Sequence, residues 1–246
     1  MRNDYIVIDA DGHVNEDADG GHALGSHLDA RFRSRVIRTG GDPRDRGQGG
    51  KYGKRHGDPA IHIEDMDVEG IDVAALYPTK LLAICKIEDH EYAVALCRAY
   101  NDWLADFCSY RPDRLKGVAV LPMVEPREAA RELERSVTEL GHIGGMAQPY
   151  AYNHKVADAC YDDLYACAQQ LDVPIAFHAG GESPSLPERF DTFIEAHTLG
   201  HTVEQMTAAT LITYSGILER YPRLRVAFLE GLVGWVPMLA ERMDEE

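Results

Sequence analysis

The strongest constraint on the fold is a repeated alternation of short apolar runs with longer stretches of helical periodicity. Apolar runs without a polar residue at every second position are typical of strands buried on both faces of a parallel sheet. Six such runs are expected as strands, at Tyr5–Ile8, Val73–Tyr77, Gly117–Leu121, Ile143–Ala147, Val173–Phe177 and Val226–Leu229. Helices are expected between and after them, at Ile61–Glu69, Asp89–Ser109, Pro126–Leu140, Lys155–Leu171, Val203–Arg220 and from Trp235 onward. This alternation predicts an α/β protein with a parallel sheet.

A closed barrel is favoured over an open, doubly wound sheet. The first expected strand lacks the glycine-rich GxGxxG turn that dinucleotide-binding sheets carry at this point. Polar residues stand just past the carboxyl ends of several strands, where a TIM-type barrel has its active site: Asp9–His13, Pro78, Thr79, Gln148, His178 and Glu230. We therefore expect residues 1–246 to form one TIM-type (β/α)8 barrel domain. About six of its eight βα units are visible, so we expect the chain to be incomplete at its C-terminal end.

A basic, glycine-rich insertion, residues 31–60, interrupts the pattern after the first strand. Its part Arg31–Arg55 holds nine of the 25 basic residues and almost no apolar ones. A flexible, solvated loop is one interpretation, and a cationic lid over a site for an anionic substrate is another. An RNA-binding arm is a third, which the scarcity of aromatic residues other than Phe32 and Tyr52 disfavours.

Charge and cysteine content narrow the class of partner. With 25 Lys and Arg against 41 Asp and Glu, the net charge of −16 argues against binding to nucleic acid or to an anionic membrane. Neither a signal peptide nor an apolar stretch of membrane-spanning length is visible. The cysteines are odd in number and form no CxxC pair, which indicates reduced thiols and a cytoplasmic location: Cys85, Cys97, Cys108, Cys160 and Cys167.

A metal site is indicated at the ends of the first and fifth expected strands. Asp11 and His13 are two residues apart, so strand geometry places both side chains on one face. His178 ends the strand Val173–Phe177 and is followed by glycines. A carboxylate and two imidazoles suit one divalent ion, with Zn²⁺ expected first and Mn²⁺ or Fe²⁺ as alternatives. Two alternatives without a metal are open. Either Asp11 only forms a turn beside a polar His13, or His178 is a core histidine whose ring is hydrogen-bonded to a backbone carbonyl.

Other polar residues are candidates for catalysis or substrate binding. Glu230 ends the sixth expected strand, and its alternative role is an ion pair with an arginine or a helix N-terminus. His201 opens the helix before that strand and is expected to reach the site, unless it is an exposed residue at the helix start. Thr79 and Gln148 follow the second and fourth strands and are expected to contact a small-molecule substrate.

Several segments of the chain resemble the amidohydrolase-related family of metal-dependent hydrolases and decarboxylases, the group that contains aminocarboxymuconate-semialdehyde decarboxylase. The resemblance covers nearly the whole chain except Arg31–Arg55. The most specific segment is Phe228–Pro237. The other segments that carry it are Ile8–Glu16, Asp65–Val73, Arg111–Gly117, Val173–His178 and Leu218–Val226.

The resemblance implies a barrel with one catalytic metal, whose ligands map onto Asp11, His13 and His178. The family's further aspartate, after its eighth strand, has no counterpart here. The decarboxylase branch places a histidine acid–base at the end of strand six, where this chain has Glu230. The identity of the catalytic base is therefore open.

Two reactions fit such a site, hydrolysis by an activated water and decarboxylation of a small cyclic or conjugated carboxylate. Glu230 or Glu16 is expected to act as the acid if burial raises its pKa. The arginines of the insertion favour a carboxylate substrate and hence decarboxylation. A catalytically silent relative that serves as a binding or oligomerisation domain is the alternative, and a metal-free sugar- or phosphate-handling barrel is a third. The open strand edges of an incomplete barrel also predict a possible homo-oligomer.

Overall fold

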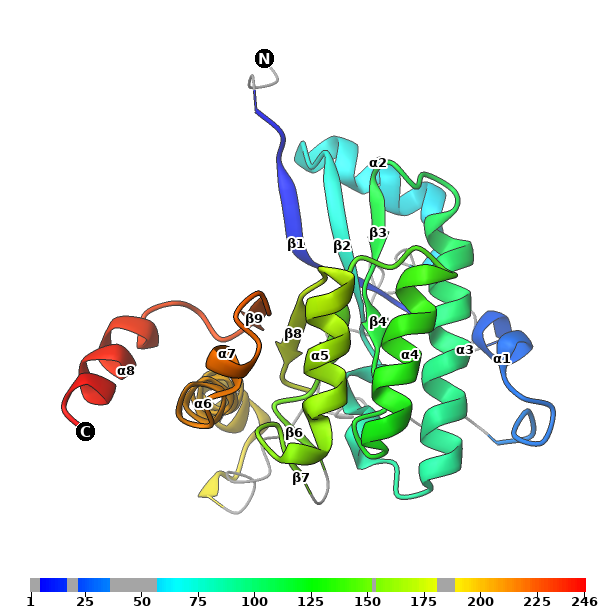
Figure 1. Ribbon diagram of the computed structural model, residues 1–246. Coiled ribbons are helices and arrows are strands. Elements are labelled where there is room, and N and C mark those ends of the chain that lie inside the picture. Colours follow the sequence, from blue (N-terminus) through cyan, green and yellow to red (C-terminus); the bar gives the residue numbers. More distant parts are fainter. Residues whose placement is uncertain (1–4, 17–21, 36–56, 152–153, 181–188) are drawn as a thin grey trace.

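Parallel strands in barrel order form the centre of the protein (Figure 1). The computed structural model describes residues 5–16, 22–35, 57–151, 154–180 and 189–246. One sheet has the order β1-β2-β3 and a second the order β4-β5-β8-β9, and every pair within them is parallel. The strands are β1 (Ile8–Val14), β2 (Val73–Pro78), β3 (Leu115–Gly117), β4 (Ala119–Val120), β5 (Gly145–Ala147), β8 (Ile175–His178) and β9 (Val226–Leu229).

The two sheets are joined by a single interrupted strand. Only Val118 separates β3, which pairs with β2, from β4, which pairs with β5. The Val118 amide donates to the Leu76 carbonyl, and the Ala119 amide donates to the Gly144 carbonyl. The described strands therefore occupy six consecutive barrel positions, the number expected from the sequence.

Helices cover the outer face of the sheet, where α3, α4 and α5 stand side by side (Figure 1). A short antiparallel hairpin, β6 (Tyr150–Ala151) and β7 (His154–Lys155), lies between β5 and α5. The helices are α1 (His22–His27), α2 (Pro59–Glu69), η2 (Leu81–Lys86), α3 (His90–Cys108), α4 (Pro126–Thr138), η3 (Ala159–Tyr161), α5 (Asp162–Leu171), α6 (Phe193–Tyr214), α7 (Ile217–Arg220) and α8 (Trp235–Asp244). None of the helices in the described ranges is long and apolar enough to cross a membrane.

Side-chain caps fix the starts of α2, α3 and α6. Asp58 accepts a hydrogen bond from the Ala60 amide at the start of α2, and Asp89 accepts one from the Tyr92 amide at the start of α3. Thr192 and Glu195 form a reciprocal capping box at the start of α6. These polar contacts satisfy amide groups that have no partner within the helix.

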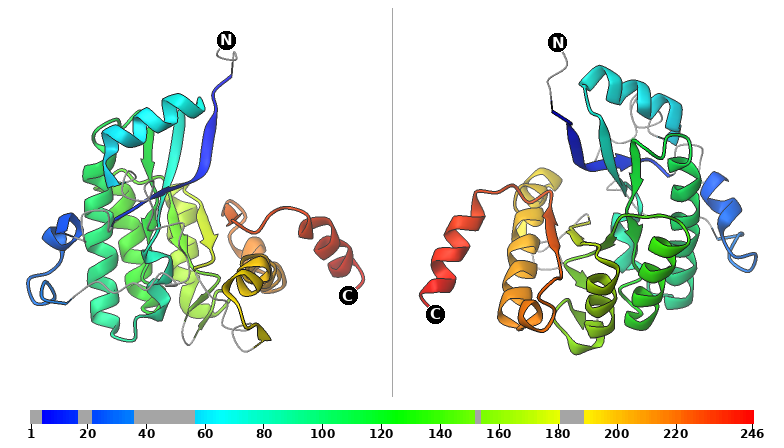
Figure 2. Two further views of the ribbon diagram at one scale, coloured as in Figure 1. Left: turned by 180° about the vertical axis from the view of Figure 1, so that it is seen from behind. Right: turned by 45° about the horizontal axis from the view of Figure 1, so that its top comes forward.

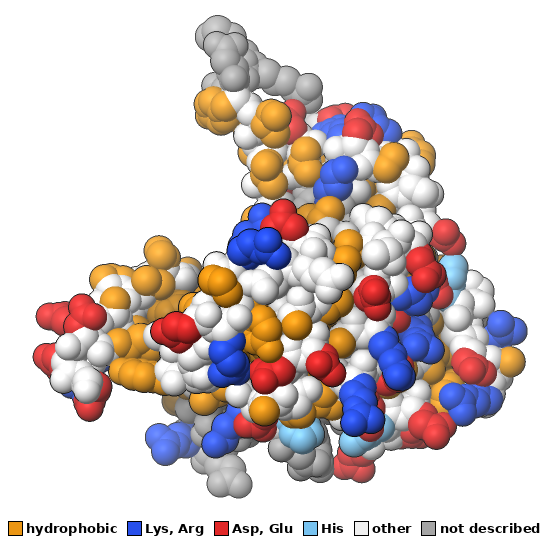
Figure 3. All heavy atoms as spheres, in the orientation of Figure 1, with side chains coloured by type: hydrophobic (Ala, Val, Ile, Leu, Met, Phe, Trp, Pro, Cys, Tyr) orange, Lys and Arg blue, Asp and Glu red, His pale blue; other side chains and the backbone are white. Residues whose placement is uncertain are grey.

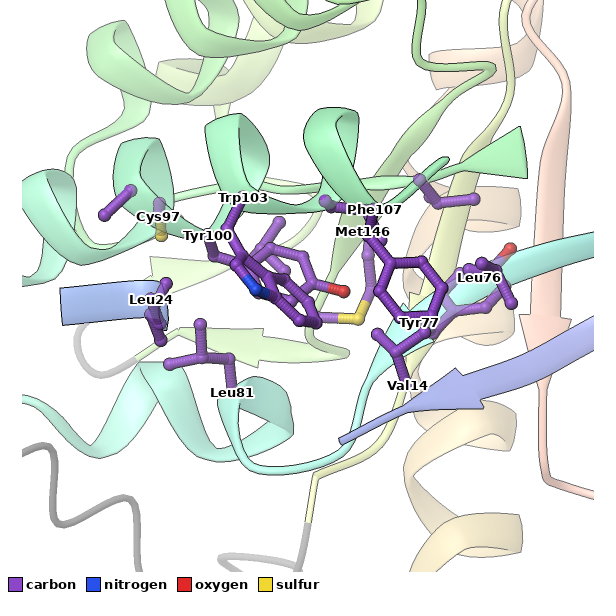
Figure 4. Close-up of a cluster of buried hydrophobic side chains, with 14 of the residues drawn as sticks. Val14, Leu24, Leu76, Tyr77, Leu81, Cys97, Tyr100, Trp103, Phe107 and Met146 are labelled. Carbon is purple, nitrogen blue, oxygen red and sulfur yellow. The ribbon is translucent and has the colours of Figure 1, made fainter. Parts of the chain in front are cut away.

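Apolar side chains pack the sheet against the helices in two clusters. The first lies between the β1–β2 pair and α3, and Figure 4 shows Tyr100, Trp103 and Phe107 of α3 packed toward Val14 and Leu76. The second lies between β5, β8 and the helices α4 to α6; its largest fully buried side chains are Tyr161, Tyr165 and Phe177. This packing holds the carboxyl ends of the strands in fixed relative positions.

Three elements differ from the expectation. The first strand is Ile8–Val14 instead of Tyr5–Ile8, so Asp11 and His13 lie within it, because the residues that pair with β2 begin at Ile8. The helix expected at Lys155–Leu171 begins only at Asp162, after β7 and η3. The helix expected at Val203–Arg220 is two helices, α6 and α7, separated at Gly216, which has a left-handed backbone (φ 70°).

The basic insertion is described only at its ends, since residues 36–56 lie outside the described residues. Arg31 forms an ion pair with Glu91 at 2.9 Å, and Arg35 forms one with Asp89 at 2.6 Å. The Arg35 guanidinium also lies 3.8 Å from the centre of the Tyr92 ring. These two arginines are therefore held at the start of α3.

The strands at the two edges of the described sheet are β1 and β9, each paired on one side only. Helix α8 projects away from the body in every view and has no buried residue (Figure 2). Figure 3 shows apolar side chains gathered around it, and the exposed ones include Leu232, Val233 and Met238. All five cysteines are free, as expected from the sequence.

Candidate metal centre

Asp11 and His13 of β1 meet His178 of β8 at the carboxyl-terminal side of the sheet. The Nε2 atoms of His13 and His178 are 3.3 Å apart, and Asp11 Oδ1 lies 3.4 Å from His178 Nε2 and 3.9 Å from His13 Nε2. One ligand atom from each residue lies within 4.8 Å of the others. Strand periodicity and parallel pairing, the basis of the sequence prediction, bring these donors to one point.

Both imidazole rings are oriented by backbone carbonyls. His13 Nδ1 is 2.8 Å from the Pro78 carbonyl oxygen, and His178 Nδ1 is 2.8 Å from that of Ala179. Since a carbonyl only accepts, each Nδ1 carries the proton, and each Nε2 presents a lone pair to the shared space. A hydrogen bond from the other ring nitrogen to a carbonyl is the usual way in which a metal-binding histidine is held.

The fit to a divalent cation also depends on Asp11. Its Oδ1 atom is buried and makes no hydrogen bond, although a buried carboxylate oxygen without a partner is costly. Two inward nitrogen lone pairs and one such oxygen form the donor set of an open Zn²⁺ or Mn²⁺ site. The residues present therefore fit the metal ion predicted from the sequence.

Burial and neighbouring charges shift the two imidazoles in opposite directions. Burial, with the nearby His178, lowers the pKa of His13. Burial would also lower the pKa of His178, but the adjacent Asp11 carboxylate outweighs it and raises that pKa. His13 is thus the more readily available as a neutral ligand.

Glu230 lies beside this triad and connects it to α6. Its Oε2 atom is 3.6 Å from His178 Nε2 and 3.2 Å from His201 Nε2. Burial alone would raise the pKa of Glu230, but the hydrogen bond from His201 and the positive charges of the nearby histidines lower it to about 2. Glu230 also has a left-handed backbone (φ 55°), a strained conformation for a residue other than glycine that often marks functional sites.

His201 reaches the site from α6, as expected, and is buried. Its Nε2 atom faces Glu230, and its Nδ1 atom is buried without a hydrogen-bond partner. One helical turn earlier, the His197 ring lies against it in a tilted arrangement, with ring centroids 4.6 Å apart. His197 was not predicted from the sequence, because the helix was expected to begin only at Val203. The spacing of two histidines by four residues was the available signal.

Glu16 lies outside the group of site residues. It is buried, and its carboxylate accepts hydrogen bonds from the backbone amides of Thr79, Lys80 and Leu81 at 3.1, 2.8 and 2.7 Å. Burial raises the pKa of Glu16, against the effect of these donors. Glu16 therefore fixes the turn whose Pro78 carbonyl orients His13. Thr79 takes part in this turn through its backbone amide.

Gln148 is fully buried, and neither its Oε1 nor its Nε2 atom has a hydrogen-bond partner. The register pairs Ala147 with Phe177, so Gln148 follows β5 at the level at which His178 ends β8. A second glutamine, Gln205 of α6, was missed in the sequence. Its Nε2 atom donates to the carbonyls of Phe177 and Leu229 and so ties α6 to both strands.

The loop after His178 passes very close to η2. A Cβ atom at Gly180 would lie 1.7 Å from the Leu82 carbonyl oxygen, so only glycine fits. The Gly180 carbonyl accepts a hydrogen bond from the Tyr150 hydroxyl at 3.1 Å. These contacts fix the backbone immediately after the His178 ligand.

Parallel strands in barrel order, with a carboxylate and two imidazoles at their carboxyl ends, define the class of barrel proteins that bind a divalent metal at this face. The family described as amidohydrolase matches residues 8–245, and the chain belongs to that family. The family resemblance and the TIM-type barrel fold expected from the sequence are both confirmed.

Among curated proteins, the chain is similar to gamma-resorcylate decarboxylases. That of Polaromonas sp. is 32% identical over 169 residues, which are 65% of this chain and 52% of the relative. That of Rhodococcus jostii is 31% identical over 201 residues, which are 75% of this chain and 59% of the relative. The chain thus spans between half and two thirds of the length of the first curated relatives that it matches.

Solved structures agree on the fold. A 5-carboxyvanillate decarboxylase from Novosphingobium aromaticivorans, solved with bound manganese, has a TM-score of 0.76 at 25% identity over 98% of this chain and 70% of that one. A 2,6-dihydroxybenzoate decarboxylase from Rhizobium has a TM-score of 0.63 at 22% identity over 90% of this chain and 65% of that one. A divalent metal is in line with these structures, whereas zinc as its identity stays a prediction.

Proposed function

We propose that this protein is a metal-dependent decarboxylase of small aromatic carboxylates that carry a hydroxyl group. The observation that supports this most is the convergence of Asp11 Oδ1 with the Nε2 atoms of His13 and His178. The names of the curated relatives point to the substrate class, since gamma-resorcylate is such a compound.

Asp11, His13 and His178 would hold the cation, and Zn²⁺ and Mn²⁺ both suit their donor atoms. When bound, the ion supplies Lewis-acid polarisation of the substrate's carboxylate and neighbouring hydroxyl oxygen. His13 and His178 need no reorientation for this, because Pro78 and Ala179 already hold their rings.

Decarboxylation replaces a carboxylate by one proton, so the site must hold a proton close to the reacting carbon. His201 and Glu230 are suited to that role, because a proton on His201 Nε2 is shared with Glu230 Oε2 at 3.2 Å. Glu230 Oε2 in turn lies 3.6 Å from His178 Nε2, so the proton is held beside the triad. Glu230 then serves as the carboxylate that positions His201, in place of the acid expected from the sequence.

Gln148 is the best candidate for recognising the substrate among the residues expected to do so. It has a free donor and a free acceptor in a buried position; a substrate hydroxyl could donate to Oε1, and a substrate carboxylate could accept from Nε2. The arginines at the described start of the insertion are engaged with Asp89 and Glu91 and carry no part of this proposal.

A cytoplasmic location is part of the proposal. The five free cysteines suit a reducing compartment. None of the five forms a disulfide bond that would need an oxidising compartment.

The test is turnover by the purified protein with Mn²⁺ or Zn²⁺ and a panel of hydroxybenzoates that includes 2,6-dihydroxybenzoate. Release of CO₂ and of the matching phenol is the expected result, and His178→Asn should abolish it. The control His27→Asn changes a histidine of α1 that pairs with Asp106 and should keep full activity. Turnover of lactones or amides in place of the benzoates would establish the hydrolase alternative. Metal binding without any turnover would establish the silent relative.

A further inference from the structure

A second cluster of metal-binding side chains lies on the β6–β7 hairpin and the turn that follows it. His154, Asp158 and Cys160 each offer one ligand atom, and these atoms lie within 4.8 Å of one another. None of the three belongs to the triad, and none has a part in the proposed decarboxylation. Their elements lie at the lower end of the view in Figure 1.

The donor distances are close to those of a bound ion. Zn²⁺ bond lengths of about 2.0–2.3 Å to nitrogen, oxygen and sulfur imply donor separations of about 3.3–3.8 Å in a tetrahedron. His154 Nδ1 and Asp158 Oδ2 are 3.8 Å apart. Only small side-chain rotations are needed, and all three side chains are at least partly exposed, so an ion can enter from solvent.

The backbone that carries the donors is held rigidly. The Lys155 amide donates to Asp158 Oδ2 at 2.9 Å, and the Asp158 amide donates back to the Lys155 carbonyl at 2.9 Å. Beneath this turn, Tyr165 donates its hydroxyl to the Val156 carbonyl. The turn that carries the ligands is therefore ordered before an ion binds, which lowers the entropic cost of binding.

Buried Tyr161 orients the histidine of the cluster. Its ring meets the His154 ring edge to face, with centroids 6.0 Å apart, and its hydroxyl is anchored on the Met123 carbonyl. The hydrogen bond to Asp158 likewise restrains the carboxylate, as outer contacts of metal ligands usually do.

We propose that His154, Asp158 and Cys160 form a zinc-binding site separate from the triad. An imidazole, a carboxylate and a thiolate favour Zn²⁺ and disfavour Mg²⁺ and Ca²⁺, which prefer oxygen donors. Three protein ligands leave the fourth position to water. The ion would cross-link β7 to η3 on the hairpin whose Tyr150 hydroxyl binds the Gly180 carbonyl, two residues after His178.

Co²⁺ distinguishes this site from the triad, because only a site with a sulfur ligand gives a thiolate-to-cobalt absorption band and the triad contains no sulfur. Adding Co²⁺ to the metal-free protein should produce a thiolate-to-cobalt charge-transfer band in the near ultraviolet. Cys160→Ser should remove the band, and Cys167→Ser, at the half-buried cysteine, should keep it. His154→Gln should weaken the Co²⁺ affinity that the band reports by at least about 10-fold.

Metal content separates this proposal from the proposed decarboxylase. After saturation with Zn²⁺ and removal of free ion, Cys160→Ser should hold one ion per chain fewer than the wild type, whether or not the triad is filled. In the wild type, Zn²⁺ should also slow alkylation of Cys160, a measurement that needs no variant. Absence of the cobalt band, a band that survives Cys160→Ser, or alkylation at an unchanged rate would each overturn the zinc site.

Discussion

His13 and His178 face each other edge to face, with their Nε2 atoms 3.3 Å apart and their ring planes at 89°. Both rings donate their Nδ1 protons to backbone carbonyls, so two lone pairs point at the same small space. Such a pair is unfavourable unless a proton or a metal ion lies between the nitrogens. The orientation of the two rings is therefore already suited to metal binding before an ion is bound, and the sheet holds it in place.

Removing one of these imidazoles should remove the metal. In His178→Asn we expect the affinity for Mn²⁺ or Zn²⁺ to fall by more than the roughly 10–100-fold that loss of an outer contact costs. In the wild type, an ion at 100 times its Kd should add about 2.7 kcal/mol to the free energy of unfolding, and the variant should lose that gain. Thermal unfolding with and without metal measures this. An equal gain in His178→Asn would contradict the site, and His27→Asn is the control.

The sequence could predict the triad because its geometry depends on local rules. Residues Asp11 and His13 share a face since strand side chains alternate, and His178 joins them since parallel strands end at one edge. The fold followed from the same periodicity, and the expected Val226–Leu229 strand agrees residue for residue with β9. Helix starts after long loops were less predictable, as the early start of α6 illustrates.

The role of Glu16 could not be read from the sequence. Its partners are backbone amides more than 60 residues away, and a backbone amide leaves no mark in the sequence. The pairing of Glu230 with His201 was equally hidden, since it depends on how α6 is placed against β9. Long-range contacts of this kind are set by tertiary packing.

The variant Glu230→Gln should show whether Glu230 is a metal ligand or acts through His201. If Glu230 positions His201, the variant keeps its metal content but loses about 100-fold or more in kcat, the usual contribution of acid–base catalysis. Metal analysis and steady-state kinetics on the same preparation decide between the two roles. Loss of the metal along with activity would make Glu230 a ligand. The control, Glu64→Gln on the exposed face of α2, should change neither.

Glu16 should make stability depend on pH in a defined direction. Because burial raises its folded-state pKa above the ordinary 4.5, the folded protein holds this proton more tightly than the unfolded chain. The resulting stabilisation is complete below pH 4.5 and is lost as pH rises through the raised pKa. Glu16→Gln should cost about 1–3 kcal/mol at low pH through weakened hydrogen bonds, and less as pH rises. Urea unfolding of both proteins from pH 4.5 to 8 checks this, and a gap that widens with pH would refute it.

Gly180→Ala should disturb the metal site through the backbone. The new Cβ would fall 1.7 Å from the Leu82 carbonyl oxygen, so the loop after His178 must move. We expect a loss of at least about 1–3 kcal/mol in the free energy of unfolding, together with weaker metal binding. Gly234→Ala is the matched control, since its Cβ would meet no atom within 4 Å and its φ of −62° suits alanine. Equal stability of the two variants would show that the Leu82 contact is easily relieved.

The edge of the sheet at β1 should make the protein self-associate. Within the described sheet, β1 pairs only with β2; Ile6, just before β1, is 72% exposed, and Ile8, its first residue, is 63% exposed. An unpaired strand edge with apolar side chains is a template for pairing with a second chain. We expect light scattering after size exclusion to show dimers or larger species that increase with protein concentration.

Ile8→Lys should shift the protein toward the monomer, because a charge at the edge opposes pairing. Val68→Lys, at an 84% exposed position of α2 and outside strand β1, adds the same charge and should leave association unchanged. A wild type that stays monomeric at every concentration would show that β1 is protected, and equal effects of the two lysines would assign association to net charge.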